Sequence, residues 1–221
     1  MRRTLAILPL VALLSGCIDI PQPRERQAVR QSTAQVSPAP AARQCLSRLG
    51  MARVDFTPLP DQYYGAGCST LNSVRIASLR SDEGMLALTR LGPVSCPLAD
   101  TFAGWARYGV DRAAQQILGS PLVRIETMGS YSCRNVAGTG RLSAHATANA
   151  IDVSGFVLAD GRRITVLDDW SGGTPSERKF LRVIHESACK RFGTVLSPDY
   201  NAAHRDHFHV EVDEGGRSFC R

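Results

Sequence analysis

The sequence predicts an α+β domain in which a small antiparallel sheet is flanked by helices. Three patterns indicate this fold class. Apolar residues repeat at helical spacing after a helix-start signal at 174–177, two short apolar runs are joined by an Asp-Gly turn at 159–162, and residues 207–212 alternate between apolar and polar side chains. With 43% hydrophobic and 21% charged residues, the chain of 221 residues has the composition of a globular protein.

Three helices are predicted. The first opens at Pro97 and carries apolar residues on one face: Leu98, Phe102 and Trp105. Residues 111–118 predict a second helix, which ends at Gly119. The third begins at the capping box of residues 174–177, and its apolar residues repeat at helical spacing until Gly193: Phe180, Leu181, Ile184 and Ala188.

Four strands are predicted, at residues 122–127, 152–158, 163–167 and 207–212. The second and third are joined across residues 159–162, where an Asp-Gly pair favours a hairpin turn. The fourth strand has one apolar face, which holds Phe208, Val210 and Val212. Its other face holds His207, His209 and Glu211, so the two histidines point to the same side.

The first 16 residues have the layout of a bacterial lipoprotein signal peptide. Two arginines precede an apolar run at residues 5–14, which is too short for the roughly 18 to 20 residues that span a bilayer. The run ends in Leu14-Ser15-Gly16-Cys17, which resembles a lipobox. The resemblance implies that Cys17 is acylated, and Ile18 after it favours the outer membrane. We therefore expect a periplasmic, lipid-anchored protein.

Residues 17–43 are expected to form the lipidated cysteine and a proline-rich tether. After Cys17 this segment holds four prolines and no aromatic residue, a composition that cannot bury a core. A flexible chain of about 25 residues reaches on the order of 30 Å. The folded domain, expected over residues 44–221, would therefore act at a distance from its anchor, on a target outside the membrane.

Net charge and hydropathy exclude two classes of protein. The formal charge is +6, and the lysines and arginines are scattered along the chain, so a nucleic-acid partner is not expected. The single short apolar run excludes a polytopic membrane protein, and contact with the membrane is expected only through the lipid anchor. The oligomeric state is left open.

The seven cysteines divide into one lipid attachment site and six candidates for disulfides: Cys45, Cys68, Cys96, Cys133, Cys189 and Cys220. Six cysteines allow 15 pairings, and the sequence does not choose among them. Our working hypotheses are Cys45 with Cys68 and Cys189 with Cys220. No thiol is left over for a metal.

Histidines and aspartates gather in residues 143–152 and 204–209. Two imidazoles and a carboxylate can hold Zn²⁺ and leave a fourth position open for water, as in catalytic zinc sites. Asp206, beside the two histidines of the last strand, is a candidate base. Strict alternation would place it on the opposite face, so we expect it at the strand entrance. Each pattern alone is more often an ordinary polar surface, but together they favour a metal site.

These residues resemble known families. Ser143-x-His145, Ala150-x-Asp152 and Asp206-His207-x-His209 are similar to the motifs of the LAS metallopeptidases, the lysostaphin-like, D-alanyl-D-alanine and hedgehog-like zinc domains, and are closest to the D-alanyl-D-alanine branch. Over the folded domain the chain more specifically resembles the bacterial extensin-like C-terminal domain family. The similar segments are residues 129–134, 150–156, 192–196, 198–201 and 219–221.

The resemblance implies a LAS-like domain and a role for each site residue. The implied zinc ligands are His145, Asp152 and His209. Asp206 would be the general base, and His207 would stabilise the developing oxyanion. Arg134 would hold the substrate, with Arg141 as the other candidate; a solvated surface charge is the alternative for either arginine.

The chain departs from the family patterns at two alanines. Ala148 stands where the peptidase motif has glycine, and Ala144 where the extensin-like family usually has glutamate. Neither is a proposed ligand, so metal binding should suffer less than catalysis. Of the other histidines, His204 is interpreted as a loop residue, with a place in the site wall as the alternative, and His185 as a structural or surface residue.

Two functions follow as expectations. The first is a zinc-dependent peptidase or amidase that acts on peptidoglycan or another cell-wall peptide. The second is a non-catalytic, zinc-containing lipoprotein that binds or supports the cell wall. The site motifs favour the enzyme, and the two alanines favour the binding protein.

Overall fold

The computed structural model describes residues 39–212 and 218–221. The signal peptide, Cys17 and the tether up to residue 38 lie outside the described residues, so the expectations about them stay predictions. Helix α1 (Pro40–Met51) begins inside the segment expected to be tether and takes in its last four residues. No helix in the described part of the chain is long and apolar enough to cross a membrane.

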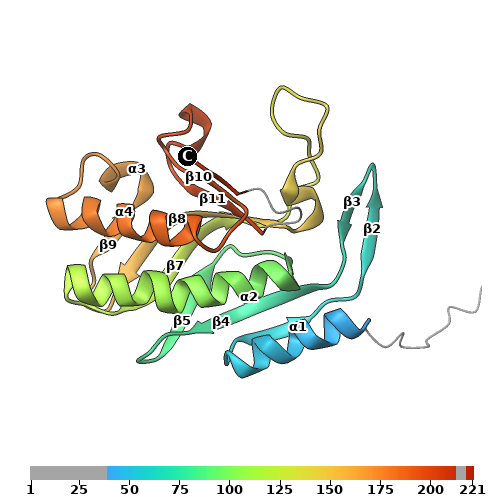
Figure 1. The fold of residues 1–221 in the computed structure, drawn as a ribbon, viewed down its shortest axis with the longest axis horizontal. Coiled ribbons are helices and arrows are strands. Elements are labelled where there is room, and N and C mark those ends of the chain that lie inside the picture. The colour runs from blue at the N-terminus through green and yellow to red at the C-terminus, as the bar shows by residue number, and fades with distance from the viewer. Residues whose placement is uncertain (1–38, 213–217) are drawn as a thin grey trace, which may run out of the picture. The chain divides into compact units, whose positions relative to one another are not determined.

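The described residues form a mixed α/β domain (Figure 1). Its strands are β1 (Asp55–Pro58), β2 (Gln62–Gly65), β3 (Cys68–Thr70), β4 (Ser73–Arg80), β5 (Met85–Thr89), β6 (Val94–Ser95), β7 (Leu122–Gly129), β8 (Ala150–Leu158), β9 (Arg163–Thr165), β10 (Thr194–Leu196), β11 (Phe208–Glu211) and β12 (Phe219–Cys220). After α1, the helices are α2 (Cys96–Trp105), η1 (Ala106–Asp111), η2 (Ala114–Leu118), η3 (Ala144–Thr147), α3 (Val166–Asp169), α4 (Pro175–Cys189) and η4 (Ala202–His204).

The main sheet is larger than the sequence predicts. Ten strands join in the order β1-β4-β5-β7-β8-β11-β10-β12, with β6 beside β4 and β9 beside β8, while β2 and β3 form a separate hairpin. The pairs β5–β7 and β10–β12 are parallel, so the sheet is mixed and not purely antiparallel. The strands before residue 96 were not predicted, and four of them, β1, β2, β3 and β6, have four residues or fewer. All four residues of β2, for example, are exposed and show no alternation.

The predicted helices at Pro97 and at residues 111–118 are one helix. The helical run continues without a break from Cys96 through the π-helical turns η1 and η2 to Leu118, and Gly119 ends it in the left-handed conformation with φ 71°. Gly109 lets this long helix approach α4, because a Cβ there would lie 2.5 Å from Ser187 Oγ. The third predicted helix is confirmed as α4, including the capping box of Thr174 and Glu177.

The predicted strand at 163–167 is wrong at its end. Strand β9 stops at Thr165, and residues 166–169 form helix α3. The reason is local: the Thr165 hydroxyl accepts a hydrogen bond from the backbone N–H of Asp168 and caps the helix. The turn at 159–162 and the antiparallel pairing of β8 with β9 are confirmed.

The core lies between the sheet and helices α2 and α4, which cross the same face of the sheet (Figure 1). Phe156 of β8 contacts both Trp105 of α2 and Phe180 of α4, and all three are fully buried. Phe208 of β11 faces α4, where its ring contacts His185. Because side chains alternate along a strand, His209 must point to the opposite face of the sheet.

Three disulfides join the six predicted cysteines. Cys189 pairs with Cys220, as expected, and links α4 to β12. The hypothesis that Cys45 pairs with Cys68 is wrong: Cys45 pairs with Cys96, and Cys68 pairs with Cys133. The reason is tertiary packing, because α1 packs against α2, whereas the β2–β3 hairpin packs against η3 and, through Tyr64, against Tyr131 in the loop that follows β7.

Candidate metal centre

The three predicted metal ligands meet on the face of the sheet that points away from α4. Asp152 on β8 and His209 on β11 are direct partners in the antiparallel register, and the short helix η3 brings His145 beside them. His145 Nε2 lies 3.2 Å from His209 Nδ1 and 3.1 Å from Asp152 Oδ2, and His209 Nδ1 lies 2.8 Å from Asp152 Oδ1. Ligand atoms around tetrahedral zinc lie about 3.3 Å apart for bonds of about 2.0–2.1 Å. The donor set therefore fits zinc.

Hydrogen bonds on the far side of each ring decide which nitrogen can bind a metal. His145 Nδ1 lies 3.1 Å from the carbonyl oxygen of Ser130, which can only accept, so Nδ1 carries the hydrogen and Nε2 offers a lone pair to the cluster. His209 has the opposite arrangement: Nε2 lies 2.8 Å from Glu211 Oε1, so Nε2–H donates and Nδ1 faces the cluster. His145 thus offers a lone pair to the cluster, whereas both nitrogens of His209 face carboxylates in the metal-free domain, so a metal bound at Nδ1 would take the place of a proton there.

Local sequence explains how His145 reaches the site. Ser143 caps η3 by accepting a hydrogen bond from the His145 backbone N–H, and η3 ends at Ala148 in the left-handed conformation with φ 56°. Glycine adopts this conformation without strain, and alanine does not. The departure from the peptidase motif therefore falls on the one residue of this turn whose backbone favours glycine.

Electrostatics of the metal-free cluster are set by its carboxylates. Burial raises the pKa of Asp152, but hydrogen bonds with His145 and His209 outweigh burial and hold the pKa well below its ordinary value. Burial lowers the pKa of His209, but the hydrogen bonds with Asp152 and Glu211 outweigh it and raise the pKa to about 9. In the metal-free cluster a proton on His209 therefore lies beside the Asp152 carboxylate, in the place that a metal ion would take.

Asp206 and His207 lie beside the cluster. Strand β11 begins at Phe208, so Asp206 stands before the strand, as expected, and is not subject to its alternation. Asp206 Oδ1 lies 2.8 Å from His207 Nδ1, and His207 Nε2 lies 3.5 Å from Asp152 Oδ1. Asp206 therefore orients the His207 ring, whose second nitrogen faces the ligand cluster.

The two candidate arginines come from one exposed loop, residues 130–143. The disulfide Cys68–Cys133 and a β-bridge between Asn135 and Leu142 hold this loop. The charge of Arg134 acts on His204, whereas the charge of Arg141 acts on Glu211. Each arginine of the loop thus lies close enough to one group of the site for its charge to act there.

Two residues, His204 and Glu211, have a larger part in the site than the sequence predicts. His204 of η4 lies in the site wall, the alternative interpretation, with its ring centroid 5.2 Å from that of His207 and 5.9 Å from that of His209. Burial and the neighbouring His207 and His209 lower its pKa to about 4. The alternation puts Glu211 on the correct strand face but assigns it no role. Its spacing, two residues after His209 on a strand, is the available signal.

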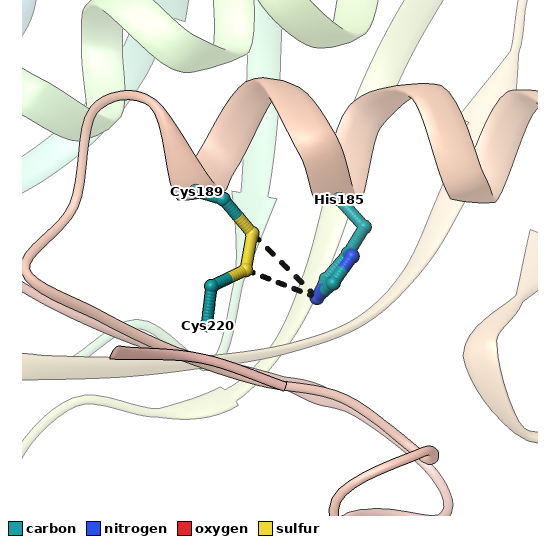
Figure 2. A group of neighbouring side chains, drawn as sticks. All are labelled: His185, Cys189 and Cys220. Atoms are coloured by element: carbon teal, nitrogen blue, oxygen red, sulfur yellow. Dashed lines mark hydrogen bonds between the residues drawn. A yellow bond between two sulfur atoms is a disulfide. The ribbon is translucent and has the colours of Figure 1, made fainter. Parts of the chain in front are cut away.

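A second grouping of possible ligands consists of His185, Cys189 and Cys220 (Figure 2). His185 Nε2 lies 3.8 Å from each sulfur, but the two sulfurs are bonded to each other and offer no thiolate. The His185 ring also packs against Trp170 and Phe208, and burial lowers its pKa. This agrees with the interpretation of His185 as a structural residue.

The fold and the site together define a class: a mixed α/β domain, stabilised by disulfides, with a His-Asp-His cluster on the face of the sheet opposite helices α2 and α4. The family model described as extensin-like protein C-terminus matches residues 43–221, and the chain belongs to this family. That part of the sequence resemblance is confirmed. No curated protein and no solved structure matches the chain. The likeness to LAS peptidases therefore rests on the motifs alone.

Proposed function

We propose that this protein is a zinc-dependent peptidase or amidase that acts on the peptide stems of peptidoglycan. The observation that carries the proposal is the convergence of His145 Nε2, His209 Nδ1 and the Asp152 carboxylate, each ring with its second nitrogen hydrogen-bonded outside the cluster. This arrangement fits the three protein ligands and open fourth position of catalytic zinc. The motif resemblance to the D-alanyl-D-alanine peptidases supports the reaction class and the substrate.

His145, Asp152 and His209 would hold the zinc, which as a Lewis acid would polarise the scissile carbonyl. The residues of the chain then have separate tasks. Asp206 accepts a proton from the attacking water and passes it to the leaving amine. His207, whose Nδ1 is held by Asp206, stabilises the developing oxyanion through its other ring nitrogen, Nε2. Arg134 holds a negatively charged group of the substrate.

The proposal includes a location. The signal-peptide layout and the lipobox at Cys17 support a periplasmic lipoprotein anchored in the outer membrane, whose tether carries the domain toward the cell wall. Fractionation of cells that express the full chain tests this. We expect the wild type in the outer-membrane fraction. The Cys17→Ser variant cannot carry the lipid and should be missing from that fraction. A wild type recovered from the cytoplasm would contradict the location.

Metal analysis tests the zinc site. The purified wild type should bind one zinc, and His145→Ala and Asp152→Ala should lose it, because each removes one of three ligands. His185→Ala is the matched control and should keep the zinc, because this histidine lies in the disulfide group. Unaltered zinc content in both ligand variants would overturn the proposal.

Catalysis is tested with peptidoglycan sacculi. The zinc-loaded wild type should release peptide fragments that mass spectrometry identifies, and the bond cut follows from their masses. Asp206→Asn should abolish release while zinc stays bound, because Asp206 is not in the ligand cluster.

The alternative is a non-catalytic zinc protein that binds the cell wall. Ala144 and Ala148 favour it, since the first removes a carboxylate near the site and the second keeps a strained turn. If the wild type binds zinc and sediments with sacculi but releases no fragment, this alternative replaces the enzyme.

A further inference from the structure

Glu211 and His209 lie two residues apart on β11, so both side chains point to the same face of the sheet. Glu211 Oε1 lies 2.8 Å from His209 Nε2, while His209 Nδ1, across the ring, lies 2.8 Å from Asp152 Oδ1. Glu211 therefore contacts the ring nitrogen that points away from the ligand cluster. It does not belong to the group of atoms that converge there, so it is not a ligand.

The Glu211 carboxylate is itself held in place. Glu211 lies opposite Ala150 on β8 and opposite Thr194 on β10, so it stands between two strands of the sheet (Figure 1). Ala150 is small and fully buried, which leaves room for the carboxylate, and the Thr194 side chain hydrogen-bonds to it. The positive charge of Arg141 acts on it from the loop at 130–143. A surface ion pair between two free side chains would have none of these constraints.

We propose that Glu211 is a positioning residue of the metal site: it fixes the tautomer and the ring orientation of His209, so that Nδ1 faces the metal. This inference rests on the proposed zinc site. A histidine ligand offers the correct lone pair only when its other nitrogen carries the hydrogen, and a carboxylate acceptor enforces this. Glu211 does for His209 what the Ser130 carbonyl does for His145, but only Glu211 can be changed by substitution.

The test measures zinc affinity by competition with a chelator, with zinc alone as the probe. Glu211→Ala should weaken zinc binding by about 10- to 100-fold, with the stoichiometry still one. In Glu211→Gln the amide oxygen still accepts a hydrogen bond from Nε2–H but carries no charge. The zinc affinity of this variant should therefore lie between those of Glu211→Ala and the wild type. Glu186→Gln, an exposed glutamate of α4, is the matched control and should bind zinc as the wild type does.

A spectroscopic readout separates positioning from a merely structural role. Co²⁺ in place of zinc should show altered visible absorption bands in Glu211→Ala, because the angle of one ligand changes, while circular dichroism of the metal-free domain stays that of the wild type. If Glu211→Ala does not fold, Glu211→Gln decides the question. Wild-type affinity and a wild-type Co²⁺ spectrum in the folded Glu211 variants would overturn the inference. A wild type that binds no zinc would instead overturn the proposed function.

Discussion

His209 Nδ1 lies 2.8 Å from Asp152 Oδ1 because the two residues are direct cross-strand partners of β11 and β8. A slip of one residue in this register would turn His209 toward the helices and disperse the cluster. The register is set on the other face of the strands, where Phe208 and Val210 lie opposite Val153 and Ile151 and all four are fully buried. The chemistry of one face thus depends on packing at the other.

Phe208→Ala should lower the free energy of unfolding by about 3–5 kcal/mol, the usual cost of removing a buried phenylalanine side chain. Phe208 is fully buried and contacts the rings of Trp170 and His185. Urea unfolding of the metal-free protein measures the effect. Phe219→Ala, a 44% exposed phenylalanine in β12, is the control and should cost much less. Equal losses in the two variants would show that the Phe208 contact does not anchor β11.

Ala148→Gly should stabilise the metal-free protein by roughly 0.5–1 kcal/mol. Alanine in the left-handed conformation costs about 1–2 kcal/mol, and the greater freedom of glycine in the unfolded chain cancels part of this gain. Ala146→Gly, a buried neighbour in the same turn without positive φ, should destabilise instead. Chemical denaturation of the two variants, side by side, checks the opposite signs.

Local patterns explain what the sequence could predict. The capping box of α4, the Asp-Gly turn and the alternation of β11 each involve neighbours in sequence, and all three are present. The same alternation puts His209 and Glu211 on one face of the strand, where they hydrogen-bond to each other. The convergence of His145, Asp152 and His209 could be predicted because the motifs that carry them are short and close to strands β8 and β11.

Long-range packing explains what the sequence could not predict. The pairing of Cys45 with Cys96 depends on helix α1 lying against α2, 51 residues away, and nothing in the spacing of the cysteines signals it. The parallel pairing of β5 with β7 needs the long helix between them as a crossover. His204 reaches the site wall through a loop whose course no periodicity describes.

Zinc should stabilise the folded protein, because the ligand atoms converge only in the folded state. At a free zinc concentration 100 times the Kd, the free energy of unfolding should rise by about 2.7 kcal/mol. Asp152→Ala should abolish this increase, and Mg²⁺ should not replace zinc, since two imidazoles suit zinc far better. Urea unfolding with and without metal checks it. An equal gain in the Asp152 variant would mean that zinc binds elsewhere.

Acid should weaken the start of helix α4. Hydrogen bonds from the backbone and side chain of Thr174 lower the pKa of Glu177. A carboxylate with a lowered pKa contributes stability that is present above its unfolded pKa and is lost as pH falls through the folded pKa. Glu177→Gln should therefore narrow the difference in thermal midpoint between pH 6 and pH 3, whereas Glu186→Gln, exposed on the same helix, should leave it unchanged. Identical pH profiles for wild type and Glu177→Gln would contradict this.

The substitutions Arg134→Ala and Arg141→Ala should have different effects on the hydrolysis of sacculi. The charge of Arg134 acts on His204, whose ring contacts His207, whereas the charge of Arg141 acts on Glu211, which contacts His209. Arg134→Ala should therefore lower kcat/KM by about 10- to 100-fold, the loss of one charge-assisted hydrogen bond to substrate, without releasing zinc.

Arg141→Ala should act on the metal and not on the substrate. At saturating zinc its kcat/KM should stay within about 3-fold of the wild type, as expected for an exposed charge that does not touch the substrate. At limiting zinc its activity should fall further, because Glu211 loses a neighbouring positive charge that helps to hold its carboxylate. Activity measured across a zinc titration distinguishes the two variants. If Arg141→Ala, at saturating zinc, loses more activity than Arg134→Ala, then Arg141 is the residue that holds the substrate.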